Sequence, residues 1–280
     1  MRRQKKILTV QDISGYGKCS ATIALPVLSA AGHSASLLPT AVLSTHTGGL
    51  GNQVLIDLTD QIAPITTHWA SIGLTFDAIY TGYAASFLQL KEIQNAVSLL
   101  KKQNTILLVD PAMADNGSLY RSCSPELVSG MQMLCQSADW ITPNITEAFL
   151  LLQQPFQEGP YTLPFLFDLL SGLSGLGARN VVITGITEGD SISVYCLYAE
   201  EKKFYKVGFP FIQGRYHGTG DLFSSTLLAA LLAGKKEEAA VSLAAEITYR
   251  AVLQTSNANE DPRHGLCFEP ELPFLWESLK

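Results

Sequence analysis

The chain has 280 residues, of which 47% are hydrophobic and 16% charged, and this composition predicts a large hydrophobic core and excludes extensive disorder. Its net charge is −6 and its basic residues form no long run, so nucleic acid is not an expected partner. No segment contains the roughly 20 consecutive apolar residues of a membrane span, so a membrane is not expected either.

Cysteine usage and linker composition indicate the compartment and the number of domains. The 5 cysteines have no Cys-x-x-Cys spacing and their number is odd, which favours reduced thiols and a cytoplasmic location. The linker-like stretch 154–164 is too short to divide the chain, so we expect a single domain over residues 1–280.

Short apolar runs alternate with longer helical patterns, which predicts an α/β fold with a mainly parallel sheet and helices on both of its faces. We expect strands near residues 6–11, 35–41, 78–82, 105–110, 139–142 and 180–185, followed by an antiparallel pair near 191–198 and 203–209. Helices are expected over residues 18–31, 51–70, 86–102, 124–136, 145–152, 162–176, 221–233 and 236–254.

The residues that directly follow the predicted strands are nearly all polar or glycine, a pattern that core packing alone does not require. In open sheets of this kind, ligands bind beyond the carboxyl ends of the strands. The residues at these positions are Asp12 and Ser14, Thr45 to Gly49, Gly82 and Tyr83, Asp110 to Asp115, Thr142 to Glu147, and Thr184 and Gly185. The sequence therefore predicts a ligand site at this edge of the sheet.

The segment 217–223 precedes a helix that is almost entirely apolar. Backbone N–H groups around Gly218, Thr219 and Gly220 would face outward from its first turn, where the helix dipole also favours an anion. Asp221 would then face the group that attacks this anion, as the base of a phosphoryl transfer. An ordinary turn in which Thr219 or Asp221 caps the helix also fits this segment.

Carboxylates follow the strand predicted at 105–110 and begin the helix predicted at 145–152. Asp110, Asp115 and Glu147 would suit Mg²⁺ between phosphates, since Mg²⁺ prefers a few carboxylates together with water. Asn144 and Glu147 also have the spacing of a capping box, and capping is compatible with a ligand role.

Two histidines adjoin the predicted site. The loop from Thr45 to Gly49 carries two hydroxyl groups and the imidazole of His46 on a flexible backbone. A solvated turn and a ligand-binding loop both fit this composition. His217 directly precedes the glycines of the predicted anion site.

Taken in order, these motifs resemble the ribokinase superfamily, and specifically its pyridoxal kinase branch. The resemblance spans about residues 7–235 and is carried by Gln11 and the following turn, Ser44 to Gly48, Thr81 to Tyr83, Asp110 to Asp115, Thr142 to Asn144, Glu147 and Ala148, Val182 to Thr184, and Gly218 to Phe223. It implies a ribokinase-like three-layer αβα sandwich. It also implies an enzyme of vitamin B6 salvage that transfers the γ-phosphoryl group of ATP to the 5′-hydroxymethyl group of pyridoxal, pyridoxine or pyridoxamine.

The resemblance also implies roles for individual residues. Asp221 would be the general base, and the anion hole would consist of the N–H groups around Gly218, Thr219 and Gly220. The residues expected to bind the substrate are Asp12, Ser14, His46, Thr47 and Tyr83, of which Thr47 and Tyr83 would contact the pyridine ring. Those expected at the nucleotide are Asn144, Glu147 and Thr184, and those expected at Mg²⁺ are Asp110, Asp115 and Glu147. A monovalent cation such as K⁺ near Asp110, Thr142, Glu147 and Thr184, and a homodimer, are further implications.

One residue departs from the pyridoxal kinase pattern. Asp12 follows Gln11 where pyridoxal kinases commonly have serine, and the turn from Asp12 to Gly15 is similar to the Asp-x-Ser-Gly turn of hydroxymethylpyrimidine kinases, a sister branch. A carboxylate there favours a protonated ring nitrogen or a ring substituent that donates a hydrogen bond. The chain also lacks the length that sugar kinases of the superfamily use for a β lid, so a flat aromatic alcohol is the expected substrate.

Two alternatives stay open at this point. One is a hydroxymethylpyrimidine kinase of thiamine biosynthesis, which the turn at Asp12 favours. The other is a non-catalytic protein that binds vitamin B6. The presence of Asp221 and of the complete loop from Gly218 to Gly220 argues against this alternative.

Overall fold

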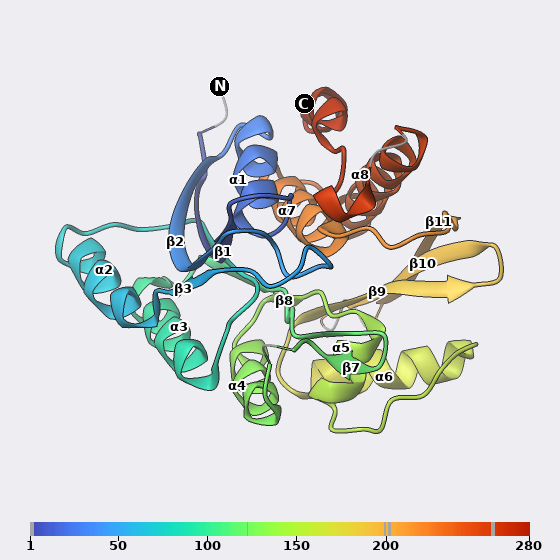
Figure 1. The fold of residues 1–280 in the computed structure, drawn as a ribbon, viewed down its shortest axis with the longest axis horizontal. Helices are drawn as coiled ribbons and strands as arrows, with labels where there is room; N and C mark the ends of the chain where they lie inside the picture. Colours follow the sequence, from blue (N-terminus) through green and yellow to red (C-terminus); the bar gives the residue numbers. More distant parts are fainter. Residues whose placement is uncertain (1–2, 122, 199, 201–202, 259–260) are drawn as a thin grey trace.

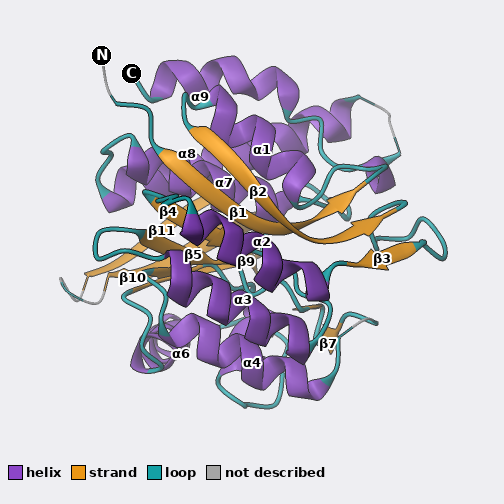
Figure 2. Cartoon of the chain, turned by 90° about the vertical axis from the view of Figure 1, so that its left-hand side faces the viewer, coloured by secondary structure: helices purple, strands orange, loops and turns teal. Residues whose placement is uncertain are grey.

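A 9-stranded sheet runs through the middle of the molecule, with helices against both of its faces (Figures 1 and 2). The computed structural model describes residues 3–121, 123–198, 200, 203–258 and 261–280. In spatial order the strands are β11 (Lys203–Pro210), β10 (Ser191–Tyr198), β9 (Asn180–Glu188), β8 (Trp140–Ile141), β5 (Ile106–Val109), β4 (Ala78–Thr81), β1 (Lys6–Ser14), β2 (Ser34–Leu43) and β3 (Leu55–Asp57). A separate 2-stranded hairpin consists of β6 (Ala114–Asp115) and β7 (Ser118–Leu119).

The central strands of the sheet are parallel, from β2 through β1, β4, β5 and β8 to β9. The outer pairs β2 with β3, β9 with β10, and β10 with β11 are antiparallel. The mainly parallel sheet and the antiparallel pair near 191–198 and 203–209 are therefore confirmed. Because the central strands are parallel, their carboxyl ends meet at one edge of the sheet.

The helices form two layers that bury two separate parts of the core (Figure 1). One face of the sheet is covered by α1 (Ala21–Ala30), α7 (Thr219–Leu232), α8 (Glu237–Asn257) and α9 (Leu272–Ser278). The other is covered by α2 (Thr59–Ser71), α3 (Phe87–Leu100), α4 (Pro125–Gln136), α5 (Ile145–Leu151) and α6 (Leu163–Gly175). Two short 3₁₀ helices, Pro262–His264 and Glu269–Glu271, precede α9.

Helix α7 is enclosed because it packs against the sheet on one side and against α1 and α8 on the others. Residues 222–230 of this helix are all buried, which explains why they include no charged side chain. A helix that is apolar around its whole circumference is typical of such an interior position. The enclosure fixes the N-terminus of α7 relative to the ends of the strands.

The structure corrects several predicted boundaries. The helix expected over 51–70 begins only at Thr59, because 55–57 instead form the edge strand β3 and Asp57 accepts hydrogen bonds from the Thr59 N–H (2.7 Å) and hydroxyl (2.5 Å). The helix expected from residue 18 begins at Ala21, after Ser20 with a φ of 53°. Neither the β6–β7 hairpin nor α9 was expected. Asn116 and Gly117 turn that hairpin with φ values of 51° and 75°, which suit a tight two-residue turn.

Within the described ranges, the helices are too short or too polar to cross a membrane.

The enclosure of α7 leads to a stability prediction. Leu227→Ala, at a side chain with 0% exposure, should lower the free energy of unfolding by about 2–5 kcal/mol, because it removes buried apolar surface and leaves a cavity. Leu253→Ala in α8, where the side chain is 39% exposed, is the matched control and should change it by about 0.5 kcal/mol or less. Urea unfolding followed by circular dichroism measures both. Equal losses for the two variants would contradict the packing described for α7.

Candidate functional site

The N-terminus of α7 lies directly against the turn between β1 and α1. Gly218 has a φ of 89°, and a Cβ atom on it would lie 2.7 Å from the carbonyl oxygen of Lys18 and 2.4 Å from Ile23. Glycine is therefore required both for the backbone conformation and for this close approach. The carboxylate of Asp221, in the first turn of α7, accepts a hydrogen bond of 2.8 Å from the N–H of Ser20.

No side chain caps α7, so the interpretation of this segment as an ordinary capped turn does not hold. Asp221 is bonded to Ser20 instead, and the hydroxyl of Thr219 donates to the carbonyl oxygen of Tyr216 at 3.4 Å. The N–H groups of the first turn lack intrahelical partners and point outward from the positive end of the helix dipole. This arrangement can hold an anion.

Asp221 is poised to titrate near neutral pH. Burial and the negative charge of Asp12 raise the pKa of Asp221 to about 7, although the hydrogen bond from Ser20 acts in the opposite direction. A carboxyl group with such a pKa can accept a proton from a hydroxyl group and release it again at physiological pH. Strongly perturbed carboxyl groups of this kind are typical of functional sites.

Asp110, directly after β5, lies beneath the first turn of α7. The hydroxyl of Ser224 donates to its Oδ2 atom at 3.3 Å, and Thr142 lies 2.8 Å from the same hydroxyl. A Cβ on Gly220 would lie 3.4 Å from Asp110 Oδ2, so the backbone at Gly220 passes closely over this carboxylate. Burial raises the pKa of Asp110, the charge of Asp221 raises it further, and the Ser224 hydrogen bond lowers it.

Glu147 forms the expected capping box with Asn144 at the start of α5. Its Oε2 accepts from the N–H of Asn144 at 2.9 Å, and its Oε1 accepts from the N–H groups of Met113 (3.1 Å) and Ala114 (3.4 Å). Burial and the charge of Asp110 raise the pKa of Glu147 despite these donors. Both carboxylate oxygens of Glu147 thus already accept hydrogen bonds from backbone N–H groups. Glu147 is therefore better placed to contribute negative charge to the site than to bind a metal ion directly.

Asn144, in the segment after β8, forms a bridge with Thr184 in the middle of β9. The N–H of Thr184 donates to the carbonyl oxygen of Pro143 at 2.9 Å, and the side chain of Asn144 donates to the carbonyl oxygen of Ala114 at 2.8 Å. These contacts join Asn144 to the β6–β7 hairpin and the preceding Pro143 to the middle of β9. The predicted nucleotide residues therefore lie together.

Asp115, in contrast, is exposed, and its two oxygens accept hydrogen bonds from the backbone and side chain of Asn116 at 2.8 and 2.7 Å. In the part of the chain that the structure describes, no three His, Cys, Asp or Glu side chains converge to hold a metal alone. Asp110 nevertheless fits Mg²⁺, because its one side-chain donor, Ser224, bonds to Oδ2. One such carboxylate with phosphate oxygens and water is a coordination that Mg²⁺ accepts in nucleotide sites.

Asp12 lies at the end of β1, next to Ser14 and Ser20. It is 4% exposed, and the hydroxyl of Ser14 donates to its Oδ2 at 3.4 Å. Burial raises its pKa, and the hydroxyl of Ser20 and the charge of His46 lower it. Ser20 lies between the two carboxylates, because its N–H donates to Asp221 at 2.8 Å and its hydroxyl bonds to Asp12, and the charge of Asp12 raises the pKa of Asp221.

The two histidines of the predicted site contact each other, with ring centroids 5.0 Å apart. The Nδ1 atom of His46 accepts from the N–H of Gly48 at 3.0 Å, and its Nε2 lies 2.5 Å from the carbonyl oxygen of Arg263. Burial, His46 and Arg215 lower the pKa of His217, and the charge of Asp115 raises it.

Thr47 and Tyr83 lie on the loops that follow β2 and β4. Thr47 is exposed, which places it in solvent and not among the buried carboxylates. Tyr83 is half-buried next to Gly82, and a Cβ on Gly82 would lie 3.0 Å from the amide nitrogen of Gln11.

Several residues at the site were not among those predicted from the sequence. Burial and the charges of Asp221 and Asp12 raise the pKa of the Cys19 thiol, which shows that the thiol lies near both carboxylates. The side chain of Gln11 is fully buried, and its amide makes no hydrogen bond of ordinary geometry with the residues that the structure describes. Gln11 directly precedes Asp12 at a position of β1 that is fully buried, and a buried amide next to a predicted site residue was the available signal.

The segment 261–268 also braces the site, although the sequence around it was uninformative. The N–H of Lys18 donates to the carbonyl oxygen of His264 at 3.1 Å, and a Cβ on Gly265 would lie 2.7 Å from the carbonyl oxygen of Lys18. Together with the contact between His46 and Arg263, these contacts hold the β1–α1 turn and the loop that follows β2 in place.

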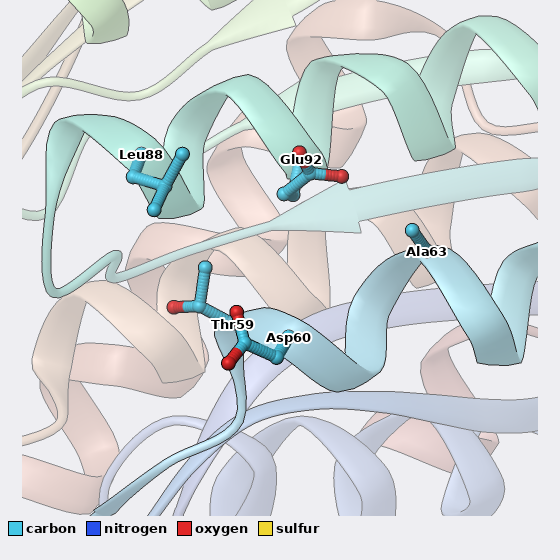
Figure 3. Close-up of a pocket in the computed structure, with 5 residues that line it drawn as sticks. All are labelled: Thr59, Asp60, Ala63, Leu88 and Glu92. Carbon is cyan, nitrogen blue, oxygen red and sulfur yellow. The ribbon is translucent and has the colours of Figure 1, made fainter.

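A surface hollow of about 210 Å³ lies between α2 and α3 and is lined by Thr59, Asp60, Ala63, Leu88 and Glu92 (Figure 3). It contains no predicted site residue, and it is smaller than the roughly 300–1,000 Å³ of typical ligand pockets. These helices cover the face of the sheet opposite α7. We therefore place the candidate site at the N-terminus of α7 and not in this hollow.

A layered α/β fold with a glycine-rich helix N-terminus opposite buried carboxylates is that of a ribokinase-like small-molecule kinase. The chain belongs to the phosphomethylpyrimidine kinase family, whose model matches residues 26–265. The expected ribokinase-like fold is thereby confirmed.

Some relatives are named as phosphomethylpyrimidine kinases and others as pyridoxal kinases. A Bacteroides thetaiotaomicron protein, provisionally named phosphomethylpyrimidine kinase and crystallised with pyridoxal, is 34% identical, with a TM-score of 0.93 over 98% of this chain and 96% of its own. Pyridoxal kinase from Lactobacillus plantarum is 31% identical, with a TM-score of 0.90 over 98% and 97%. A Caenorhabditis elegans protein provisionally named pyridoxal kinase is 32% identical over 159 residues, which are 55% of this chain and 48% of that protein. The chain thus spans about half the length of this last relative.

The buried carboxylates predict a stability that depends on pH. The pKa of Asp110 is raised from 3.8 by folding, so the folded chain holds this proton more tightly, and the resulting stability is lost as the pH rises from about 4 through the folded pKa. Asp110→Asn removes the titration. Its free energy of unfolding at pH 8 should exceed that of the wild type by at least about 1.4 kcal/mol, the equivalent of one pKa unit.

Urea unfolding at pH 5 and pH 8, without divalent or alkali cations, measures this effect, and the gain should shrink at pH 5. Asp168→Asn, at an exposed carboxylate of α6, is the matched control and should show no pH-dependent gain. An Asp110→Asn protein less stable than the wild type at pH 8 would contradict the electrostatic description.

Proposed function

We propose that the protein is an ATP-dependent kinase of vitamin B6 salvage, which phosphorylates the 5′-hydroxymethyl group of pyridoxal, pyridoxamine or pyridoxine. The observation that carries this proposal is the carboxyl group of Asp221, whose pKa is raised to about 7 in the first turn of α7. It is supported by the family of the chain and by the pyridoxal present with the Bacteroides thetaiotaomicron relative.

In the proposed reaction, Asp221 accepts the proton of the substrate hydroxyl group while the hydroxyl oxygen attacks the γ-phosphorus of ATP. The bond between the γ-phosphorus and the bridging oxygen breaks, and ADP leaves with that oxygen. The N–H groups around Gly218, Thr219 and Gly220 donate hydrogen bonds to the oxygens of the moving phosphoryl group. Phosphoryl transfer requires mainly positioning and charge stabilisation, which a helix N-terminus can supply without a P-loop lysine.

The nucleotide would lie over the ends of β5, β8 and β9. We assign Asn144, Glu147 and Thr184 to the nucleotide and Asp110 to direct ligation of Mg²⁺, and we propose that Asp115 and Glu147, whose oxygens already accept hydrogen bonds, act on the ion through their charge. Mg²⁺ would neutralise charge on the phosphate oxygens. A monovalent cation such as K⁺ near Asp110 and Glu147 would further offset their buried charges.

The substrate ring would lie between the β1–α1 turn and the loops that follow β2 and β4. We assign Asp12, Ser14, His46, Thr47 and Tyr83 to it. Support comes from the contacts that join Ser14 to Asp12 and hold His46 between Gly48 and Arg263.

A hydroxymethylpyrimidine kinase is the second candidate, favoured by the family description and by the Asp12 turn. A non-catalytic B6-binding protein is disfavoured, because binding alone does not need a carboxylate with the pKa of Asp221.

We further propose that the protein is a single-domain, cytoplasmic homodimer. The exposed apolar side chains of Val54 (67%) and Ile56 (56%) at the β3 edge support association, since such edges are usually covered.

The proposed function predicts ADP release with ATP, Mg²⁺ and a B6 form, and a B6 5′-phosphate identified as product by mass spectrometry. Hydroxymethylpyrimidine is the comparison substrate. Turnover of the pyrimidine alone would replace the B6 proposal by the second candidate, and binding of a B6 form without turnover would favour the non-catalytic one.

The role of Asp221 has its own test. Asp221→Ala should lower kcat by about 10²–10⁴ or more, the usual contribution of a general base, while ATP binding measured by calorimetry persists. Asp168→Asn is the control for loss of a carboxylate elsewhere and should keep its turnover. Near-wild-type turnover in Asp221→Ala would refute the assignment.

A further inference from the structure

Asp12 places a second buried carboxylate beside the proposed base. Its side chain is 4% exposed, and it lies where the pairing of β1 with β2 shifts register between Gln11 and Ile13. The transfer of a phosphoryl group needs one base, which Asp221 supplies. The negative charge of Asp12 repels that of Asp221. This repulsion is unfavourable unless a bound ligand offsets it.

The two cations on the segments that hold the site together are paired with other carboxylates. The Lys18 ammonium group pairs with Glu269 at 2.9 Å, and the guanidinium group of Arg263 pairs with Asp261. The ring of His46 contacts the N–H of Gly48 and the carbonyl oxygen of Arg263. The hydrogen-bond partners of Asp12 are the hydroxyl groups of Ser14 and Ser20, and its side chain forms no ion pair with the described residues.

The substrate chemistry identifies what can balance this charge. In every B6 form the 4′ substituent is attached to the ring carbon next to the one that bears the reacting 5′-hydroxymethyl group. A substrate whose hydroxyl group bonds to Asp221 thus brings its 4′ substituent to the side of that residue. Pyridoxamine carries an ammonium group there, pyridoxine a hydroxyl group, and pyridoxal an aldehyde, which can only accept hydrogen bonds.

We propose that Asp12 is a specificity-determining residue that binds an amino group next to the reacting hydroxymethyl group, so that the enzyme prefers pyridoxamine to pyridoxine and pyridoxal. An ammonium group between Asp12 and Asp221 forms charge-assisted hydrogen bonds and relieves their repulsion. Hydroxymethylpyrimidine also carries an amino group beside its hydroxymethyl group, which explains how a similar turn suits the sister branch. This inference rests on the proposed B6 kinase function.

The test is kcat/KM for pyridoxamine, pyridoxine and pyridoxal in the wild type, Asp12→Asn and Asp12→Ser. The wild type should prefer pyridoxamine to pyridoxal by about 10-fold or more, the scale of a charge-assisted hydrogen bond. Asp12→Asn should lower kcat/KM for pyridoxamine by about 10- to 100-fold and that for pyridoxal by less than about 3-fold, which reduces or reverses the preference. Asp12→Ser, with the residue common in pyridoxal kinases, should behave in the same way.

Asp168→Asn is the control and should keep the wild-type order of substrates, and thermal unfolding verifies that each variant is folded. An equal loss of kcat/KM for all three substrates in folded Asp12→Asn would overturn the inference, because it would assign Asp12 a general role. So would a wild type that uses pyridoxal as well as pyridoxamine. Neither result affects the B6 kinase function, which is refuted only by the absence of turnover with every B6 form.

Discussion

The burial of unbalanced negative charge at the carboxyl edge of the sheet is the constraint on which the site depends. Asp12, Asp110, Glu147 and Asp221 have hydroxyl and N–H donors as partners. Among the ion pairs of the described residues, none includes any of these four carboxylates. Such a cluster is unfavourable in the free protein and becomes favourable when ligands bring cations. A nucleotide with Mg²⁺ and an amine-bearing substrate both meet this requirement, so the same charges that destabilise the fold select the ligands.

Much of the site could be predicted from the sequence because it depends on local patterns. The apolar run of β5 ends at Asp110, the spacing of Asn144 and Glu147 is that of a capping box, and the apolar helix behind Gly218 and Asp221 must be buried. Each pattern fixes which residue follows a strand or begins a helix. The parallel order of the strands then brings these residues to one edge.

The features that were missed depend on segments far apart in the chain. The sequence predicts helix where the edge strand β3 lies, because the pairing of β3 with β2, and not its own three residues, determines its conformation. The bracing of Lys18 by Gly265 and of His46 by Arg263 depends on where the end of the chain packs. The occupation of both Glu147 oxygens by N–H groups depends in the same way on the position of Met113 and Ala114.

The central claim is that burial beside Asp12 tunes Asp221 for proton transfer near neutral pH. The most direct measurement is an NMR titration of protein labelled with ¹³C at the aspartate carboxyl groups, with Asp221→Asn used to identify the Asp221 resonance. The account predicts that this resonance titrates with a pKa of about 7. A midpoint near 4, the ordinary value of an exposed aspartate, would contradict the account.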